Sequence, residues 1–172
     1  MGRVRLALGV FLGLMDLHEG GGTSNKEWLP MMVHADLQSK QYLVDAQTGQ
    51  IYSMISTDVV SLPKKTVLPT PPQAQSCPLF IPTAPGAERS TEEYDDAPLS
   101  EKLDVHSAGT ILYGIITGNR PWDNERENHS KAAIQKGKCP QIMDDVMRNT
   151  EGAVDAELVR LLDRVYEGDP VH

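Results

Sequence analysis

The sequence predicts a mainly α-helical domain with one short β-hairpin, and three patterns predict it. Apolar residues recur at helical spacing near both ends of the chain, in residues 4–17 and 158–165. Residues 108–116 are apolar on all sides, which is typical of a helix packed on every face. Between residues 17 and 108, Gln47-Thr48-Gly49 separates two short apolar runs and predicts a hairpin turn.

The first predicted helix places Val4, Leu8, Phe11 and Met15 on one stripe and ends at glycines 20–22. A basic tip followed by a short apolar centre is also found in secretory signal peptides. No small-residue cleavage site follows, because the chain continues with Asp-Leu-His-Glu. We therefore expect a folded helix here.

The other elements follow from local patterns. The two strands of the hairpin are expected at residues 42–44 and 50–54. A further helix is expected within residues 131–141, which contain a glycine and a proline at their exit. The apolar residues of 158–165 recur at i, i+3, i+4 and i+7, and Asp155 is the expected N-cap of that last helix.

Composition limits the class of protein. A chain of 172 residues is long enough for one domain with a core. The formal net charge of −8 argues against nucleic acid and anionic membranes as partners. Two cysteines provide no disulfide framework, and no apolar run approaches the roughly 18 residues that would cross a bilayer. These features predict a cytoplasmic protein that binds neither nucleic acid nor membrane.

The stretch Met32 to Asp45 holds the candidate functional residues. It places His34 and Asp36 before a polar run that ends in the apolar pair Leu43-Val44. One interpretation is a loop-to-strand junction with a surface aspartate. Another is a metal or nuclease site built on His34 and Asp36, although no second cluster with ligand spacing accompanies them.

This stretch resembles the catalytic loop of protein kinases, His-Arg-Asp-Leu-x-x-x-Asn, with His34, Ala35, Asp36, Leu37 and Gln41 at its five positions. The resemblance implies that Asp36 and His34 are catalytic residues, with Asp36 as the carboxylate that accepts the proton of the substrate hydroxyl. It implies ATP and Mg²⁺ as cofactors, with Gln41 as a weakened metal ligand. Leu43, two residues further on, matches the floor beneath the adenine.

A second stretch, residues 100–118, resembles the opening of the buried central helix of the kinase C-lobe, Asp-Val-Tyr-Ser-x-Gly. Asp104 takes the position of the aspartate, and the resemblance implies that it accepts hydrogen bonds from the backbone of the catalytic loop. Ser90-Thr91-Glu92 stands where the family has the Ala-Pro-Glu motif that closes the activation segment. Glu92 would be the structural glutamate of that motif.

Several departures from the family pattern predict weak catalysis. Ala35 and Gln38 replace an arginine and a lysine of the family's loop. Ile55-Ser56-Thr57 stands where the family has Asp-Phe-Gly, whose aspartate holds the main magnesium ion. Residues 55–76 are rich in Pro, Thr, Ser and Lys and predict a disordered or loop segment in place of the activation segment. The P-x-x-P pattern in residues 69–72 is either a linker or a ligand for an SH3-like groove.

We therefore expect residues 1–172 to form a single partial protein-kinase-like domain, the helical C-lobe with a short β-hairpin, and the N-lobe to be absent. The first hypothesis is a pseudokinase that is catalytically impaired and acts as a binding or scaffold module for a protein partner. The alternative is part of an active ATP-dependent protein kinase, a transferase, whose N-lobe and Asp-Phe-Gly segment are missing from the gene model. A third hypothesis is a fragment that folds poorly because lobe-facing apolar surface is uncovered.

Overall fold

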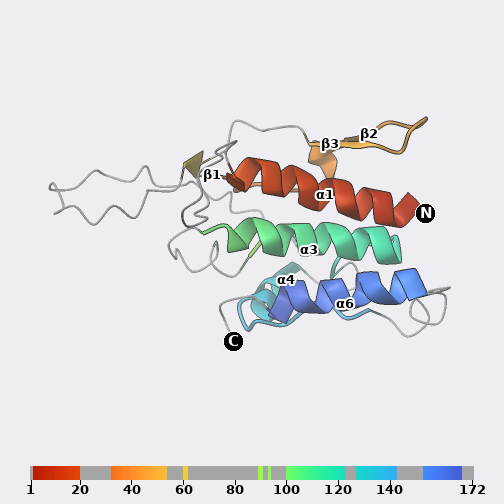
Figure 1. Cartoon of the computed structure of the whole chain (residues 1–172). Coiled ribbons are helices and arrows are strands. Elements are labelled where there is room, and N and C mark those ends of the chain that lie inside the picture. The colour runs from red at the N-terminus through yellow and green to blue at the C-terminus, as the bar shows by residue number, and fades with distance from the viewer. Residues whose placement is uncertain are drawn as a thin grey trace, which may run out of the picture.

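The computed structural model shows helices arranged in layers, with the central helix between two others (Figure 1). It describes residues 2–19, 32–53, 60–61, 89–90, 93, 100–122, 127–142 and 153–167. The predicted glycine stop at residues 20–22, residues 55–57 and Glu92 lie outside the described residues. So does the P-x-x-P pattern of residues 69–72.

The central helix is α3 (Lys102–Thr117), and it confirms the prediction of a helix buried on every side. Leu103, Leu112 and Ile116 are each at most 2% exposed. The helix ends at Gly118, whose positive φ of 74° gives the left-handed conformation that glycine adopts without a Cβ penalty. α3 packs against α1 (Gly2–Glu19) on one side and α6 (Ala153–Glu167) on the other.

Two apolar clusters meet on α3 and join the layers. Between α3 and α6, Leu112, Ile116, Leu158 and Leu162 pack together with Ala7 of α1. The second cluster lies between α1 and α3 and includes Leu37, which follows Asp36 in the loop; its buried members are Val10, Leu14, Leu37, Ala108 and Ile111. Leu37 thereby anchors the loop of the candidate site in the core.

The predicted α1 helix is present, but its buried face differs from the predicted stripe. Ala7, Val10 and Leu14 are buried, whereas Leu8 and Met15 of the predicted stripe are 55% and 50% exposed. Most of this helix is apolar, so more than one stripe has helical spacing, and the contact with α3 selects which one is buried. None of the helices in the described ranges combines the length and apolar character needed to span a membrane.

The predicted hairpin is confirmed. β2 (Tyr42–Val44) and β3 (Ile51–Ser53) pair antiparallel, with Leu43 opposite Tyr52. Within the turn, the Asp45 carboxylate accepts hydrogen bonds from the backbone N–H of Thr48 and of Gln47, and these lower the pKa of Asp45. Gly49 has a positive φ of 68°, which the turn requires.

A second strand pair was not predicted. β1 (Met32–Val33) pairs antiparallel with β4 (Val60–Ser61), which falls within the residues 55–76 that the sequence predicts as loop or disordered. The prediction of loop is therefore wrong for residues 60–61, and the rest of 55–76 lies outside the described residues. Strands of two residues carry no periodicity that a sequence pattern would reveal.

The C-terminal helices complete the fold. α4 (Glu127–Ile134) is followed by a turn in which Gly137 has a φ of 66°. α6 buries Leu158 and Leu162, as its predicted apolar stripe requires. The helix begins at Ala153, so Asp155 lies inside its first turn, and the prediction of Asp155 as the N-cap is wrong.

Candidate functional site at the Asp36 loop

The candidate site is a loop held at both ends by regular structure. β1 enters the loop, and the 3₁₀ turn η1 (Ser39–Gln41) followed by β2 leaves it. Ala35 has a positive φ of 61°, a conformation that is uncommon for a residue with a side chain. Backbone strain of this kind persists where surrounding contacts hold it, which directs attention to the groups that hold Ala35.

Asp104, in the first turn of α3, holds the loop from beneath. Its carboxylate is fully buried and accepts hydrogen bonds from the backbone N–H of His34 at 2.7 Å and of Ala35 at 3.1 Å. These hydrogen bonds are the ones that the sequence analysis predicted for this side chain. A third contact joins Asp104 to His18 Nε2 of α1, at 2.9 Å. A buried carboxylate with this many partners fixes the loop relative to two helices.

His34 occupies a structural position. The residue is 1% exposed, and its backbone N–H is the group that contacts Asp104. A buried imidazole of this kind does not face solvent, where a protein substrate would approach. The location of His34 therefore favours a role in holding the loop over a role in catalysis.

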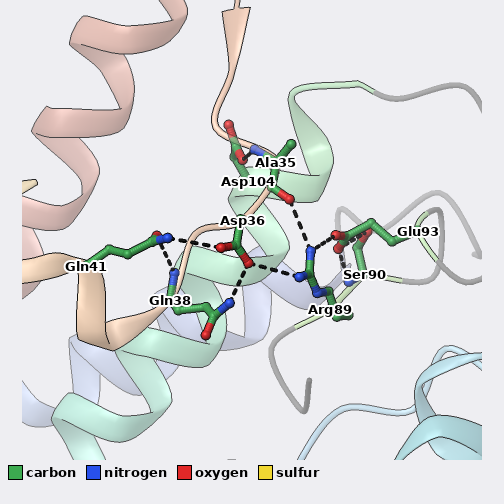
Figure 2. A network of polar contacts seen from close by, with 8 residues as sticks. All are labelled: Ala35, Asp36, Gln38, Gln41, Arg89, Ser90, Glu93 and Asp104. Atoms are coloured by element: carbon green, nitrogen blue, oxygen red, sulfur yellow. Dashed lines mark hydrogen bonds and ion pairs between the residues drawn. The ribbon is translucent and has the colours of Figure 1, made fainter. Parts of the chain in front are cut away.

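The Asp36 carboxylate is enclosed by three side-chain donors, as Figure 2 shows. Gln38 Nε2 and Arg89 Nη2 donate to Asp36 Oδ1, the latter at 2.9 Å, while Gln41 Nε2 donates to Oδ2 at 3.1 Å. The side chain retains 21% exposure. A carboxylate offers about four lone-pair positions, so most of its accepting capacity is already used within the protein.

Arg89 was not identified from the sequence, although it is central to this site. Its guanidinium contacts Asp36, the Ala35 carbonyl oxygen at 3.1 Å and the Glu93 carboxylate at 2.6 Å. Glu93 also accepts hydrogen bonds from the N–H and Oγ of Ser90. The i,i+4 spacing of Arg89 and Glu93 signals a local ion pair, but nothing in the sequence connects Arg89 to Asp36.

Among the described residues of this region, Glu93 is a buried glutamate. It is 3% exposed, and its partner Arg89 lies four residues earlier. The neighbouring Glu92, which the sequence analysis assigned to the structural position, lies outside the described residues.

The residues implied for magnesium fit that ion poorly. Magnesium requires oxygen ligands in near-octahedral geometry. Gln41 turns its amide nitrogen to Asp36, and its oxygen accepts the Gln38 backbone N–H at 3.2 Å. The described ranges contain no cluster of three or more His, Cys, Asp or Glu residues that could hold a metal ion. Leu43, implied for the adenine, is 57% exposed on β2 and is free to contact a ligand or partner.

Comparisons with known proteins support the resemblance. No protein-family model matches the chain. It is 26% identical to a dual specificity protein kinase of Dictyostelium discoideum over 98% of its length, and 32% identical to a probable LRR receptor-like serine/threonine-protein kinase of Arabidopsis thaliana over 83%. The chain covers only 29% and 15% of those two proteins.

The fold is also that of known kinases. The twitchin kinase region of C. elegans superposes with a TM-score of 0.66 at 16% sequence identity, covering 94% of this chain and 25% of that one. Titin kinase with its flanking domains gives the same TM-score at 15% identity, covering 96% of this chain and 26% of that one. Sequence relatives and structural neighbours thus agree over most of its length that this chain is a protein-kinase-like segment with a helical, C-lobe-like fold.

Proposed function

We propose that this chain is a catalytically impaired kinase-like module that acts by binding a protein partner. The observation that carries the proposal is that the Asp36 carboxylate already accepts hydrogen bonds from three side chains of the protein. One of these donors is the guanidinium of Arg89. The relatives are named as protein kinases, so the comparison supports descent from a phosphotransferase and leaves the activity of this chain as a proposal.

The chemistry of phosphoryl transfer explains why this state disfavours catalysis. A general base must come within hydrogen-bond reach of the hydroxyl whose proton it takes. At Asp36 a substrate hydroxyl competes with Arg89 and two amides for the same oxygens. Transfer also depends on cations that neutralise the developing charge on the phosphate. Gln38 and Gln41 supply none, so we expect ATP and Mg²⁺ to bind weakly or not at all.

Exposed apolar surface supports a binding role. A groove of about 920 Å³ lies between α1 and the hairpin, and Leu8, Leu12 and Tyr52 line it. These three side chains are 55%, 47% and 51% exposed. Exposed apolar patches of this kind commonly mark protein interaction sites. The net charge of −8 favours a protein, rather than nucleic acid, as the partner. We expect a cytoplasmic setting, because two cysteines provide no disulfide framework.

A phosphoryl-transfer assay with the purified chain, radiolabelled ATP and Mg²⁺ tests the impairment. We expect no transfer to a generic protein substrate and no autophosphorylation, and no difference between the natural chain and Asp36→Asn. Transfer that Asp36→Asn abolishes would overturn the proposal. A parallel thermal melt with ATP, with and without Mg²⁺, reports nucleotide binding, because a ligand that binds the folded state raises its melting temperature.

The alternative function, part of an active protein kinase, has one observation in its favour. Asp104 braces the backbone of His34 and Ala35 with short hydrogen bonds, which keeps the loop in a fixed conformation. A kinase needs this rigidity to position the aspartate that acts as its general base. Sequencing the coding region upstream for a Gly-rich loop and a Val-Ala-x-Lys strand distinguishes the two functions, and joining such a segment to the chain should then restore transfer.

A further inference from the structure

The loop lacks the two cationic residues that the kinase resemblance implies, and a distant segment of the chain supplies a cation to it. Ala35 and Gln38 stand where the family has an arginine and a lysine. Arg89 instead brings a guanidinium to this loop, because its Nη1 donates to the Ala35 carbonyl oxygen and its Nη2 to Asp36. The contact spans 53 residues of sequence.

The surroundings of Arg89 hold it in this position. The side chain is 11% exposed, and Glu93, whose side chain is 1% exposed, pairs with Nη1 at 2.6 Å. The N–H and Oγ of Ser90 hold the other Glu93 oxygen, as Figure 2 shows. A planar guanidinium with several fixed donors suits this arrangement better than an ammonium would. Partly buried charges are also screened less by salt than surface pairs are.

From this geometry we propose that Arg89 is an internal occupant of the Asp36 site. Arg89, Asp36 and Glu93 form a latch that docks Arg89, Ser90 and Glu93 on the loop and closes the Asp36 carboxylate to ligands. One cation lies between two carboxylates, so the latch is net negative and disfavours a phosphate group. The cation and both carboxylates are ordinary side chains of this sequence, so docking requires no phosphorylation. The inference rests on the proposed function and names how its site is regulated.

Carboxylate labelling tests the latch without any measurement of catalysis. The natural chain is treated with a water-soluble carbodiimide and glycine ethyl ester, and the labelling rate of each carboxylate is followed by peptide mass spectrometry. We expect Asp36 to react severalfold more slowly than the exposed Asp163 on α6. In Arg89→Gln/Glu93→Gln, which removes both charges of the most buried ion pair and leaves Asp36 its two amide donors, we expect the rate at Asp36 to rise severalfold.

Two controls separate occlusion from loss of structure. The single variant Glu93→Gln weakens the hold on Arg89 but keeps the cation beside Asp36, so the labelling rate of Asp36 should stay well below that of the double variant. Asp104 is fully buried and reports unfolding, because it becomes labelled only if the core opens. If the double variant unfolds by this criterion, Arg89→Lys is used in its place, since one ammonium cannot reproduce the fork that holds both carboxylates and the Ala35 carbonyl.

The latch would be refuted if Asp36 reacts as fast as Asp163 in the natural chain. It would equally be refuted if removing Arg89 leaves the Asp36 rate unchanged in a folded variant, or if Glu93→Gln alone raises that rate as much as the double variant does. None of these outcomes depends on phosphoryl transfer. Failure of the latch and failure of the proposed function are therefore distinguishable.

Discussion

At the scale of single residues, two aspartates near the loop have different roles because their surroundings differ. Asp104 is fully buried and accepts from two backbone N–H groups and a histidine, so its partners are fixed parts of the fold. Asp36 is partly exposed, and its donors among the described residues are side chains. Side chains can rearrange when a ligand or partner arrives, whereas backbone groups in a braced loop cannot do so cheaply. Asp104 therefore braces the loop, whereas Asp36 is the residue at which we propose that ligand binding is controlled.

Asp104→Ala should strongly destabilise the protein. The substitution leaves the His34 and Ala35 N–H groups buried without their acceptor, and it removes the partner of His18. Breaking a buried, charged network of this kind costs about 3–5 kcal/mol. Urea unfolding followed by circular dichroism measures the loss, and the matched control Asp163→Ala, at an exposed site, should change stability by no more than about 0.5 kcal/mol. A cost below about 1 kcal/mol for Asp104→Ala would contradict the bracing role.

At the scale of elements, α3 determines the arrangement of the others. It supplies Asp104 to the loop at its first turn and buries apolar side chains against both α1 and α6. Close approach to α6 depends on a small residue. A Cβ built on Gly109 would lie 2.7 Å from Val165 Cγ1, so the missing side chain allows the two helices to come together.

Two glycines of α3 provide a matched pair of substitutions. Gly109→Ala should cost about 1–3 kcal/mol, because the added methyl group overpacks the contact with Val165. Gly114→Ala meets only the Asn119 carbonyl oxygen at 3.5 Å, an ordinary contact, and should gain up to about 1 kcal/mol from helix propensity. Chemical denaturation of both variants gives the comparison. Equal effects at the two positions would show that α3 and α6 do not pack as closely as described.

At the scale of the whole molecule, one helix connects both apolar clusters. α3 contributes Leu112 and Ile116 to the cluster with α6, and Ala108 and Ile111 to the cluster with α1 and the loop. Clusters that share a helix are expected to unfold together. This organisation argues against the hypothesis that the chain folds poorly, although exposed apolar side chains remain on α1 and the hairpin.

The purified chain should show a single cooperative thermal transition, and Leu112→Ala should lower its stability by about 2–5 kcal/mol. Leu112 is 1% exposed, so truncation removes buried contacts and leaves a cavity. Leu12→Ala is the control, because Leu12 is 47% exposed on α1 and its truncation should change stability by at most about 0.5 kcal/mol. Differential scanning calorimetry tests both statements. Two separate transitions, or a broad melt without a cooperative step, would favour a fragment that does not fold independently.

The amino-acid sequence by itself determined the helices and the hairpin, because periodicity and turn residues encode them locally. The pairing of Asp104 with the loop was implied by the resemblance of two motifs to protein kinases, and the structure confirms it. The sequence did not determine which face of α1 is buried, since several apolar stripes compete and only the contact with α3 selects among them. The β1–β4 pair and the position of Arg89 also required the tertiary structure. Both join segments distant in the chain, and neither a two-residue strand nor a lone arginine carries a signal that identifies its partner.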